Sequence, residues 1–387
     1  MNNKIRVLQV TTHDEICGIA KYQEQFIDGM KQEKDIENTI FDLSPNQTRF
    51  MTKQQYEPVV KQFESVLKKA DILHIQHELA FYKHRELSTM IGLANSLNKP
   101  VIVTIHTALD VEYKKAKLPG YLPKYAITYL RQLKHQKNFE EVHLNPLKKA
   151  DLVIVHNKIT KDSLLAHGFN PEKVQVINIP IPKVDFSQKS KIIREVMSIK
   201  EKDVLICTVG FVSKTKGIDQ AIKALRLLPK NYKLAIIGGT HPDSRDNAFL
   251  DEVTDYIIDN DLVDRVHITG YIKDDNELNA MIRECDICVY PYDANYYSYV
   301  SSAALNNALA NHKAVIAYPT PTFYEINNEK EVIKICKTPN YYELAKEIKN
   351  LDINKYSLLS KEYANKYTYD KEAIKFANLY REVLKRK

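Results

Sequence analysis

The sequence predicts an α/β protein made of two doubly wound domains, each with a parallel sheet of about five or more strands. Short apolar runs alternate with helix-length amphipathic segments along the whole chain. The apolar runs are continuous rather than alternating, which is typical of parallel strands covered on both faces. The length of 387 residues also suits two domains of ordinary size.

Five strands are expected in each half of the chain. Those of the first half lie at 5–10, 71–75, 101–105, 152–156 and 174–179, and those of the second at 204–209, 233–238, 265–270, 287–292 and 314–319. Helical patterns such as 18–32 and 276–285 separate them. The motifs "ADILHI", "ADLVIV" and "CDICVY" recur where a helix is followed by a strand. We interpret this recurrence as a sign of α/β layering rather than as a sequence repeat.

A pause in the succession of strands marks the domain boundary. The segment "INIPIPKVDFSQKSK" combines Pro180, Pro182 and a polar tail, so we place the boundary near Lys183. The expected domains are 1–183 and 184–367. The last segment, "YDKEAIKFANLYREVLKRK", predicts a terminal helix within 368–387 that no strand follows.

Composition indicates a reduced, cytoplasmic chain. No apolar run approaches the ~20 residues of a membrane span, and "MNNKIRVLQV" runs into a strand without a secretory apolar region. The five cysteines are odd in number, which argues against a disulfide framework. Cys285 and Cys288 form a C-x-x-C, but no second pair exists to complete a zinc site, so burial is favoured over redox or zinc chemistry.

Most of the net charge of +7 lies in one stretch. Between Glu112 and Lys149, nine basic residues stand against three acidic ones, an excess of +6. A local basic excess of this kind indicates an anionic partner. No feature of the sequence indicates a nucleic-acid partner.

The glycines of the second half gather where strands end. Only 10 glycines occur in the chain, and the five of the second half are Gly210, Gly217, Gly238, Gly239 and Gly270. Ligands of doubly wound sheets bind at the carboxyl ends of the strands, and glycine lets a ligand approach the backbone, although it also makes tight turns. Lys216 directly precedes a helix start, where phosphate is favoured. The pattern is neither a Walker A loop nor a G-x-G-x-x-G turn, and we interpret it as another type of diphosphate clamp.

Hydroxyls and histidines occupy further strand and helix ends. Ser301 and Ser302 open a helix, either as N-caps or as phosphate ligands, and the sequence leaves both readings open. His77, His106 and His156 end three strands of the first half, and one or two of them are expected in the site. Gly18 opens a helix after the first strand.

Together these features resemble the retaining GT-B glycosyltransferases of family 4, the group 1 glycosyl transferases. The resemblance extends over essentially the whole chain and includes "EICGIAKYQEQFIDGM", "VIVTIHTALD", "VGFVSKTKGIDQAI", "AIIGGTHPD" and "ALANHKAVIA". It implies two Rossmann-like domains that face a cleft, with the last helix crossing back to the first domain. It also implies a nucleotide-sugar donor on the second domain, with UDP favoured and GDP as the alternative. The acceptor would be a glycan, a cell-surface polymer or a lipid-linked molecule, and no cofactor is expected.

The resemblance assigns roles by position. Lys216 would neutralise the donor diphosphate, and His106 would lie close to the donor sugar. The other expected donor-binding residues are Gly18, Gly210, Gly217, Gly239, Tyr271, Ile272, Ser301, Ser302 and Asn307. The expected acceptor-side residues are His13, His77, Glu78 and Lys114.

The chain departs from the family pattern at three positions. Phe211 stands where many members have an arginine, and Tyr299 and Asn307 stand where the family has paired glutamates. These departures keep open a non-catalytic GT-B subunit that binds a partner transferase or a glycan. A sugar-nucleotide epimerase fits less well, because no acid/base carboxylates are evident.

Metal chemistry is not expected. The only D-x-D, at Asp259 to Asp261, follows a helical stretch rather than a strand, which is the wrong place for a metal-bound nucleotide. Fixed positive charge would take the place of a divalent cation.

An amphipathic pattern lies inside the basic stretch. From Tyr121 to Leu133, apolar residues recur at helical spacing, and basic residues gather on another face. One interpretation is a solvated charged face over a packed apolar stripe. The other is a helix that lies on an anionic membrane surface, at the inner face of the membrane.

Overall fold

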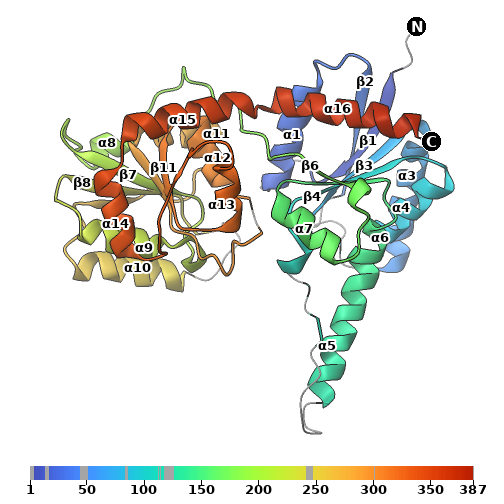
Figure 1. The fold of residues 1–387 in the computed structure, drawn as a ribbon, viewed down its shortest axis with the longest axis horizontal. Helices are drawn as coiled ribbons and strands as arrows, with labels where there is room; N and C mark the ends of the chain where they lie inside the picture. Colours follow the sequence, from blue (N-terminus) through green and yellow to red (C-terminus); the bar gives the residue numbers. More distant parts are fainter. Residues whose placement is uncertain are drawn as a thin grey trace. The chain divides into compact units, whose positions relative to one another are not determined.

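The computed structural model of the chain describes residues 4–13, 17–43, 51–82, 86–111, 113, 115–116, 126–240, 247–299 and 301–386. The chain forms two compact units, Met1–Ile179 with Tyr369–Lys387, and Pro180–Thr368 (Figure 1). Each unit contains a six-stranded sheet with helices on both faces, so the α/β two-domain prediction is confirmed. The break between the units falls at Ile179 and Pro180, whereas the sequence placed it near Lys183.

The sheet of the first unit is wholly parallel, with the order β2-β1-β3-β4-β5-β6. Its strands are β1 (Ile5–Thr11), β2 (Ile36–Asp42), β3 (Ile72–His77), β4 (Val101–Ile105), β5 (Leu152–Val155) and β6 (Val174–Val176). Strand β2 was not predicted from the sequence. This edge strand, "IENTIFD", mixes exposed and buried residues, so it lacks the continuous apolar run of a central strand.

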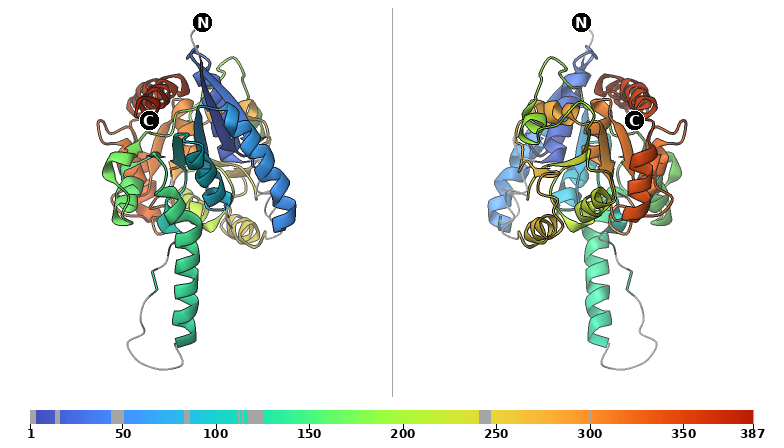
Figure 2. Two further views of the ribbon diagram at one scale, coloured as in Figure 1. Left: turned by 90° about the vertical axis from the view of Figure 1, so that its right-hand side faces the viewer. Right: turned by 90° about the vertical axis from the view of Figure 1, so that its left-hand side faces the viewer.

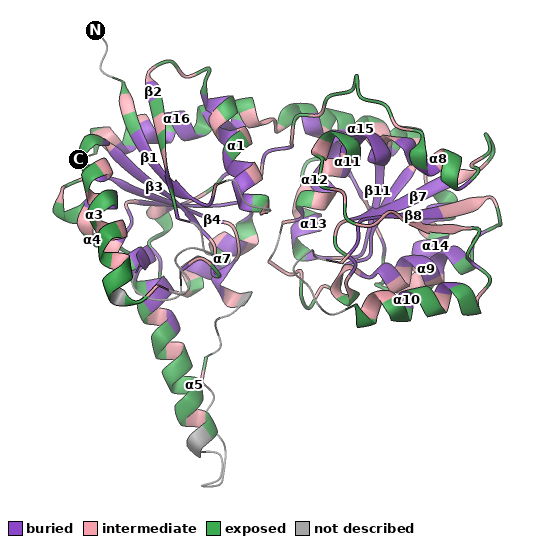
Figure 3. Cartoon of the chain, turned by 180° about the vertical axis from the view of Figure 1, so that it is seen from behind, coloured by how far each residue is buried: buried purple, intermediate pink, exposed green. Residues whose placement is uncertain are grey.

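Two apolar cores cover the faces of this sheet, and Figure 3 shows the buried strands between them. One face packs against α1 (Gly18–Met30) and the C-terminal helix α16 (Tyr369–Lys385). The other packs against α3 (Lys53–Lys69), α4 (Glu86–Ser96), α6 (Asn145–Leu147) and α7 (Lys158–Ala166). Adjacent strand residues such as Ile72 and Leu73 belong to opposite cores, as the pleat of a strand requires.

The C-terminal helix packs back on the first unit, as predicted. Phe376 and Tyr380 of α16 are fully buried in the core that α1 shares. Gly29 of α1 permits the close approach of the helices, because a Cβ there would lie 3.0 Å from the backbone of Tyr369. Arg381 adds an ion pair to Asp35, with 2.6 Å between Nη2 and Oδ1.

Helix α5 (Ala126–Phe139) is largely exposed and extends away from the sheet of its unit (Figures 1 and 2). Leu130 is 61% exposed and Leu133 is 37% exposed. The interpretation with a packed apolar stripe is therefore wrong for these two leucines, which belong to none of the apolar cores formed by the described residues. Residues 121–125 of the amphipathic pattern lie outside the described residues.

The second unit repeats the architecture with the parallel order β12-β11-β10-β7-β8-β9. Its strands are β7 (Val204–Val209), β8 (Tyr232–Ile237), β9 (Val266–Ile268), β10 (Ile287–Tyr290), β11 (Ala314–Ala317) and β12 (Lys334–Ile335). One face carries α9 (Ile218–Arg226), α10 (Ala248–Asp259) and α14 (Tyr341–Asn350). The other carries α8 (Ile192–Val196), α11 (Asp275–Glu284), α12 (Ala303–Ala310), α13 (Pro321–Ile326) and α15 (Ile353–Lys366).

The recurring Ala-Asp or Cys-Asp motif has a structural cause. In each copy the aspartate precedes a strand, and its carboxylate accepts a hydrogen bond of 2.7 or 2.8 Å from a backbone N–H of the neighbouring strand. The aspartate N–H donates in return to the carbonyl of the same residue, at 2.7 to 2.9 Å. The three pairs are Asp71 with Arg6, Asp151 with Val101, and Asp286 with Leu205.

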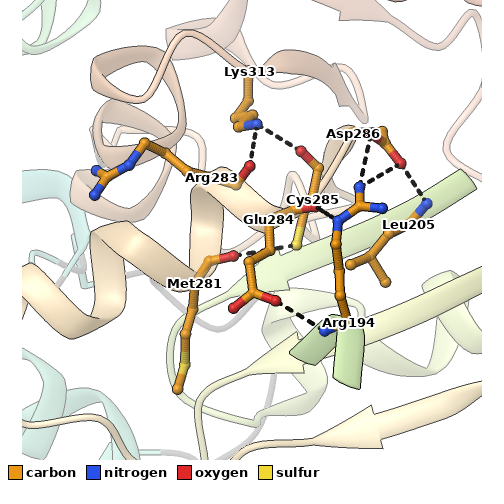
Figure 4. Close-up of polar contacts among 8 residues, drawn as sticks. All are labelled: Arg194, Leu205, Met281, Arg283, Glu284, Cys285, Asp286 and Lys313. Atoms are coloured by element: carbon orange, nitrogen blue, oxygen red, sulfur yellow. Dashed lines mark hydrogen bonds and ion pairs between the residues drawn. The ribbon is translucent and has the colours of Figure 1, made fainter. Parts of the chain in front are cut away.

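Side chains reinforce the anchor of the second unit (Figure 4). Arg194 of α8 contacts Asp286 at 3.2 Å between Nη2 and Oδ1, and its Nε donates to the Glu284 carbonyl at 2.8 Å. Lys313 Nζ donates to the Cys285 carbonyl at 2.7 Å. These contacts hold the turn between α11 and β10, so the starts of β7 and β10 are fixed together.

Candidate functional site

A lysine-bearing turn connects β7 to α9 at the carboxyl edge of the second sheet. The 3₁₀ turn Lys214–Lys216 leads into Gly217, whose φ of 68° lies in the left-handed region. A Cβ on Gly217 would lie 1.9 Å from the Pro291 carbonyl oxygen, so only glycine fits there. The turn is therefore held against the segment that follows β10.

Lys216 points into an aromatic cluster from that segment. Its Nζ lies 4.2 Å from the ring centroid of Tyr292 and 4.8 Å from that of Tyr297. Nζ also donates a hydrogen bond of 2.9 Å to the Tyr292 hydroxyl. Burial lowers the pKa of the Lys216 amine, and Tyr297 opposes that shift. The ammonium is thus partly stripped of water and held in place, which strengthens its attraction for an anion.

The hydrogen bonds continue from Lys216 to the start of α12. An ammonium can only donate, so the Tyr292 hydroxyl accepts from Lys216, and it is also hydrogen-bonded to Ser302 Oγ, 3.0 Å away, where either hydroxyl can be the donor. Ser302 is the N-cap of α12, and its Oγ also accepts from the Leu305 N–H at 3.2 Å. The helix starts of α9 and α12 are joined through Tyr292.

The glycines at this edge serve two purposes. Gly217, Gly238 and Gly239 are required by packing, because a Cβ on each would lie within 3.0 Å of backbone atoms. Gly210 and Gly270 have positive φ angles of 116° and 77°. A Cβ on Gly210 would meet only the Ala304 Cβ, at 3.9 Å, and a Cβ on Gly270 would meet nothing within 4 Å. Only these two glycines leave room for a ligand beside the backbone.

Two aromatic rings follow the two open glycines. Phe211 and Tyr271 stack with 5.9 Å between ring centroids and an interplanar angle of 11°. They are 37% and 36% exposed. Phe211, which stands in the place of the family arginine, thus adds an apolar surface beside Tyr271 instead of a charge.

The other expected donor-side residues lie near the same edge or on α12. Ile272 is half-buried and packs against the core below the edge. Ser301 is half-buried beside the N-cap, and Asn307 is half-buried further along α12. Tyr299 is also half-buried, in the segment before α12.

In the first unit, the structure brings together two of the three strand-end histidines. His106 follows β4 and His156 follows β5, with His106 Nδ1 3.2 Å from His156 Nε2. His77 belongs to a different group, because it is fully buried against Tyr82 and lies 3.2 Å from His143 Nδ1. His77 therefore offers no accessible surface to an acceptor in this structure.

The remaining expected residues of the first unit are dispersed. Glu78 lies close to His106, because its Oε2 accepts from Thr107 Oγ1 at 2.7 Å. His13 lies after β1 and donates its backbone N–H to Asp42 at 3.2 Å. Gly18 is exposed at the first position of α1, with open space around it. Lys114 lies outside the described residues.

Several buried polar residues around His106 were not predicted from the sequence. Gln76 Oε1 lies 2.8 Å from His106 Nε2, and Tyr22 packs edge-on against the His106 ring at 4.9 Å between centroids. His74, two residues before Gln76 on β3, contacts the Gln76 side-chain amide through Nε2. The sequence carried one signal for these residues, because the alternate polar residues of "ILHIQH" interrupt an otherwise buried strand.

Neither metal-binding nor membrane-spanning elements occur in the described parts of the chain. No group of three or more His, Cys, Asp or Glu residues among them could hold a metal ion. The D-x-D begins at the last residue of α10. No helix there is both long and apolar enough to cross a bilayer. Cys285, Cys288 and Cys207 are buried free thiols, with 3.3 Å between the sulfurs of Cys207 and Cys288.

Family models match most of the chain in two adjoining segments. Residues 36–182 match the model described as Glycosyltransferase Family 4. Residues 189–370 match the model described as Glycosyl transferases group 1. The two matches meet near the break between the structural units.

Curated relatives match over part of their length. The chain is 28% identical over 174 residues to the uncharacterised glycosyltransferase MJ1069 of Methanocaldococcus jannaschii, which is 44% of this chain and 42% of that protein. It is 28% identical over 156 residues to the lipopolysaccharide glucosyltransferase WaaG of Escherichia coli, which is 38% of this chain and 41% of that protein. These matches span about two fifths of each relative.

A solved structure matches over the full fold. HepE of Anabaena, in complex with UDP and glucose, has a TM-score of 0.69 at 16% identity. The match covers 98% of this chain and 100% of that one. At this identity the likeness establishes the fold alone.

The buried histidines predict a loss of stability in acid. Burial lowers the pKa of His74 to about 3 and those of His143 and His156 to about 4, from an ordinary value of 6.5. The unfolded chain therefore binds more protons than the folded chain between pH 6.5 and about 4. The free energy of unfolding should be highest above pH 6.5 and fall as the pH falls through this window. Each histidine contributes at most about 1.4 kcal/mol per pH unit.

Urea unfolding of wild type and His143→Gln across this window is the measurement. Glutamine can still hydrogen-bond His77 but does not titrate, so the slope against pH should become shallower. His135→Gln changes an exposed histidine on α5 and should keep the wild-type slope. An equal slope in His143→Gln and wild type would contradict the prediction.

Proposed function

The chain belongs to the family 4 glycosyltransferases, and we propose that it transfers a sugar from a nucleotide-sugar to a hydroxyl acceptor with retention of anomeric configuration. The observation that supports this most directly is the cluster of Lys216, Tyr292 and Ser302 at the carboxyl edge of the second sheet. A UDP-sugar is the favoured donor, in keeping with the UDP and glucose in the HepE structure, and a GDP-sugar is the alternative.

The chemistry of the reaction matches this cluster. Breaking the bond between sugar and phosphate builds negative charge on the leaving diphosphate. The Lys216 ammonium and the backbone N–H groups at the starts of α9 and α12 are donors at one edge of the sheet. Because they are already in place, they stabilise that charge without reorganising during the reaction.

Retention is proposed to follow a same-face route. The leaving phosphate would take the proton of the acceptor hydroxyl, and no carboxylate of the chain is assigned as a nucleophile. The acceptor is a glycan, a cell-surface polymer or a lipid-linked molecule bound by the first unit.

A non-catalytic GT-B subunit is the second candidate function. Tyr299 and Asn307 support it, because they stand where the family has paired glutamates. Nucleotide release from a panel of UDP- and GDP-sugars separates the two candidates. Release with one donor supports the transferase, whereas donor binding without release supports the subunit.

Fixed positive charge leads us to expect catalysis without a metal ion. Lys216 and the two helix starts supply the charge that a divalent cation would otherwise provide. Sugar transfer should therefore persist after exhaustive treatment with EDTA. A rate that falls to background and returns only with Mg²⁺ or Mn²⁺ would contradict this.

Replacement of Lys216 tests the donor site. Lys216→Ala removes a held charge from the leaving-group side, and transfer should slow by ~10²–10³, equivalent to a few kcal/mol of transition-state stabilisation. Lys214→Ala is the matched control, because Lys214 is an exposed lysine on the same turn. Steady-state nucleotide release with the preferred donor is the measurement. Equal rates for the two variants would refute the role of Lys216.

We also propose that α5 rests on an anionic membrane surface and brings the enzyme to a lipid-linked or membrane-borne acceptor at the cytoplasmic face. The helix carries Arg131, Lys134 and Lys137 and no acidic residue. Leu130 and Leu133 are exposed beside these charges. Basic residues near an anionic surface contribute about 1 kcal/mol each, and exposed leucines add apolar insertion.

Vesicle co-sedimentation tests this proposal. Wild type should bind vesicles that contain anionic lipid, and 1 M salt should release it because the Debye length falls to about 3 Å. Exchanging Arg131, Lys134 and Lys137 for Gln should abolish binding. Exchanging three exposed lysines of α3 for Gln (Lys61, Lys68 and Lys69) removes the same amount of charge and should leave vesicle binding unchanged. Equal losses in the two triple variants, or equal binding to neutral vesicles, would refute the proposal.

A further inference from the structure

A continuous line of hydrogen-bonded side chains crosses the interior of the first unit. It begins at Tyr380 of α16, whose hydroxyl lies 2.6 Å from His74 Nδ1. His74 Nε2 lies 2.8 Å from Thr104 Oγ1 and 3.5 Å from the Gln76 Nε2 position. His74, Gln76 and Thr104 are fully buried.

The line continues from Gln76 to the backbone after β6. The Gln76 Oε1 position lies 2.8 Å from His106 Nε2, and His106 Nδ1 lies 3.2 Å from His156 Nε2. His156 Nδ1 lies 2.9 Å from the carbonyl oxygen of Ile177. Both ring nitrogens of His106 and of His156 are thus engaged inside the unit.

The Ile177 carbonyl decides the direction of every bond in the line, because a carbonyl oxygen can only accept. His156 must therefore carry its proton on Nδ1, which leaves Nε2 as an acceptor when the ring is neutral. His106 must then donate from Nδ1, and its Nε2 becomes an acceptor in turn. Gln76 must present its amide nitrogen to His106, which a half-turn of the carboxamide provides.

The far end of the line agrees with this direction. With the Gln76 oxygen turned away from His106, the His74 Nε2–H donates to Thr104 Oγ1 and lies near the Gln76 oxygen. His74 Nδ1 then accepts from the Tyr380 hydroxyl. Tyr380 in turn accepts from Gln9 Nε2, 3.0 Å away. Each bond of the line from Gln9 to Ile177 then joins one donor to one acceptor without a charged ring.

The opposite direction requires a buried cation. If Gln76 kept its oxygen toward His106, His106 would carry its proton on Nε2. To complete the bond between the two rings, either His156 or His106 would then need protons on both nitrogens. Burial lowers the pKa of His156 to about 4 and that of His106 well below its ordinary 6.5, so either doubly protonated ring is disfavoured at neutral pH.

We propose that Gln76 and His156 are positioning residues that hold His106 as the neutral Nδ1–H tautomer for sugar transfer. This rests on the proposed function, since His106 is expected near the donor sugar. His106 is then a fixed, uncharged part of the site, with no spare N–H and with its Nε2 lone pair shared with the Gln76 amide. With both ring nitrogens engaged, it does not transfer a proton.

Long-range ¹H–¹⁵N spectra of protein labelled with ¹⁵N-histidine test the tautomer directly, and His106→Gln assigns the signals. We expect a protonated Nδ1 and a bare Nε2 at His106. In Gln76→Glu a carboxylate faces His106 Nε2 and can only accept, so the proton should move to Nε2 or a second proton should bind. His156→Leu removes the acceptor of the Nδ1 proton and should also abolish the pure Nδ1–H form. Gln55→Glu adds the same charge at an exposed cap of α3 and should leave the spectrum unchanged.

Kinetics with the preferred donor complete the test. Gln76→Glu should lower kcat by roughly tenfold to a hundredfold with a smaller change in KM, because the ring is held incorrectly in the transition state. An Nε2–H signal at His106 in wild type, or unchanged spectra in both Gln76→Glu and His156→Leu, would show that Gln76 and His156 do not set the tautomer of His106. A shifted tautomer with an unchanged kcat would overturn the role of that tautomer in transfer. If wild type transfers no sugar, the proposed function fails, but the spectra still decide the tautomer.

Discussion

Three strand pairs in the two parallel sheets are aligned by one repeated interaction, the reciprocal pair of hydrogen bonds between an aspartate and the start of the neighbouring strand. Asp71, Asp151 and Asp286 each occupy such a pair. A slip of one residue in a strand exchanges its two faces, so the anchor decides which side chains reach each core. In the first unit, the Asp151 anchor places Ile105 opposite Val155. The next residues, His106 and His156, are then neighbours at the carboxyl edge.

Desolvation lowers the pKa values of buried groups in both units. In the first unit, burial lowers the pKa values of His74, His106 and His156 from 6.5, so their rings are neutral at neutral pH. In the second unit, burial also lowers the pKa of Lys216 from its ordinary value of 10.5, and Tyr297 opposes the shift. The same physical effect thus acts on groups whose ordinary pKa values lie on opposite sides of neutrality.

The parts of the structure that could be predicted from the sequence are those with local causes. Continuous apolar runs marked the central strands, and the glycines and lysines between Gly210 and Gly217 marked a turn before a helix start. Ser302 could be placed as an N-cap because capping depends on a few adjacent residues. Strand β2 was not predicted because this edge strand mixes exposed and buried residues and lacks a continuous apolar run.

The parts that could not be predicted depend on which residues meet across strands. His77 and His106 look equivalent in the sequence, yet His77 points to Tyr82 whereas His106 meets His156. Tyr292 gave no signal of its own, because its contact with Lys216 joins segments separated by 76 positions. Gly238 suggested ligand approach, but a Cβ there would collide with the Gly210 carbonyl at 2.0 Å. Side-chain partnership follows from register, and register is a property of the folded sheet.

The C-terminal helix shows why the first unit needs the end of the chain. Phe376 and Tyr380 fill its core, and the Tyr380 hydroxyl ends the line of hydrogen bonds that begins at Ile177. Residues 180–368 lie between Ile179 and α16, and closing so long a loop costs conformational entropy. The second unit reduces that cost, because its own ends are paired: the Ile181 N–H donates to the Tyr367 carbonyl at 2.7 Å, and Ile181 pairs with Thr368 in parallel. Once the second unit is folded, the loop that must close between Ile179 and α16 is short. Helix α16 can then pack on the sheet of the first unit, where Tyr380 hydrogen-bonds His74.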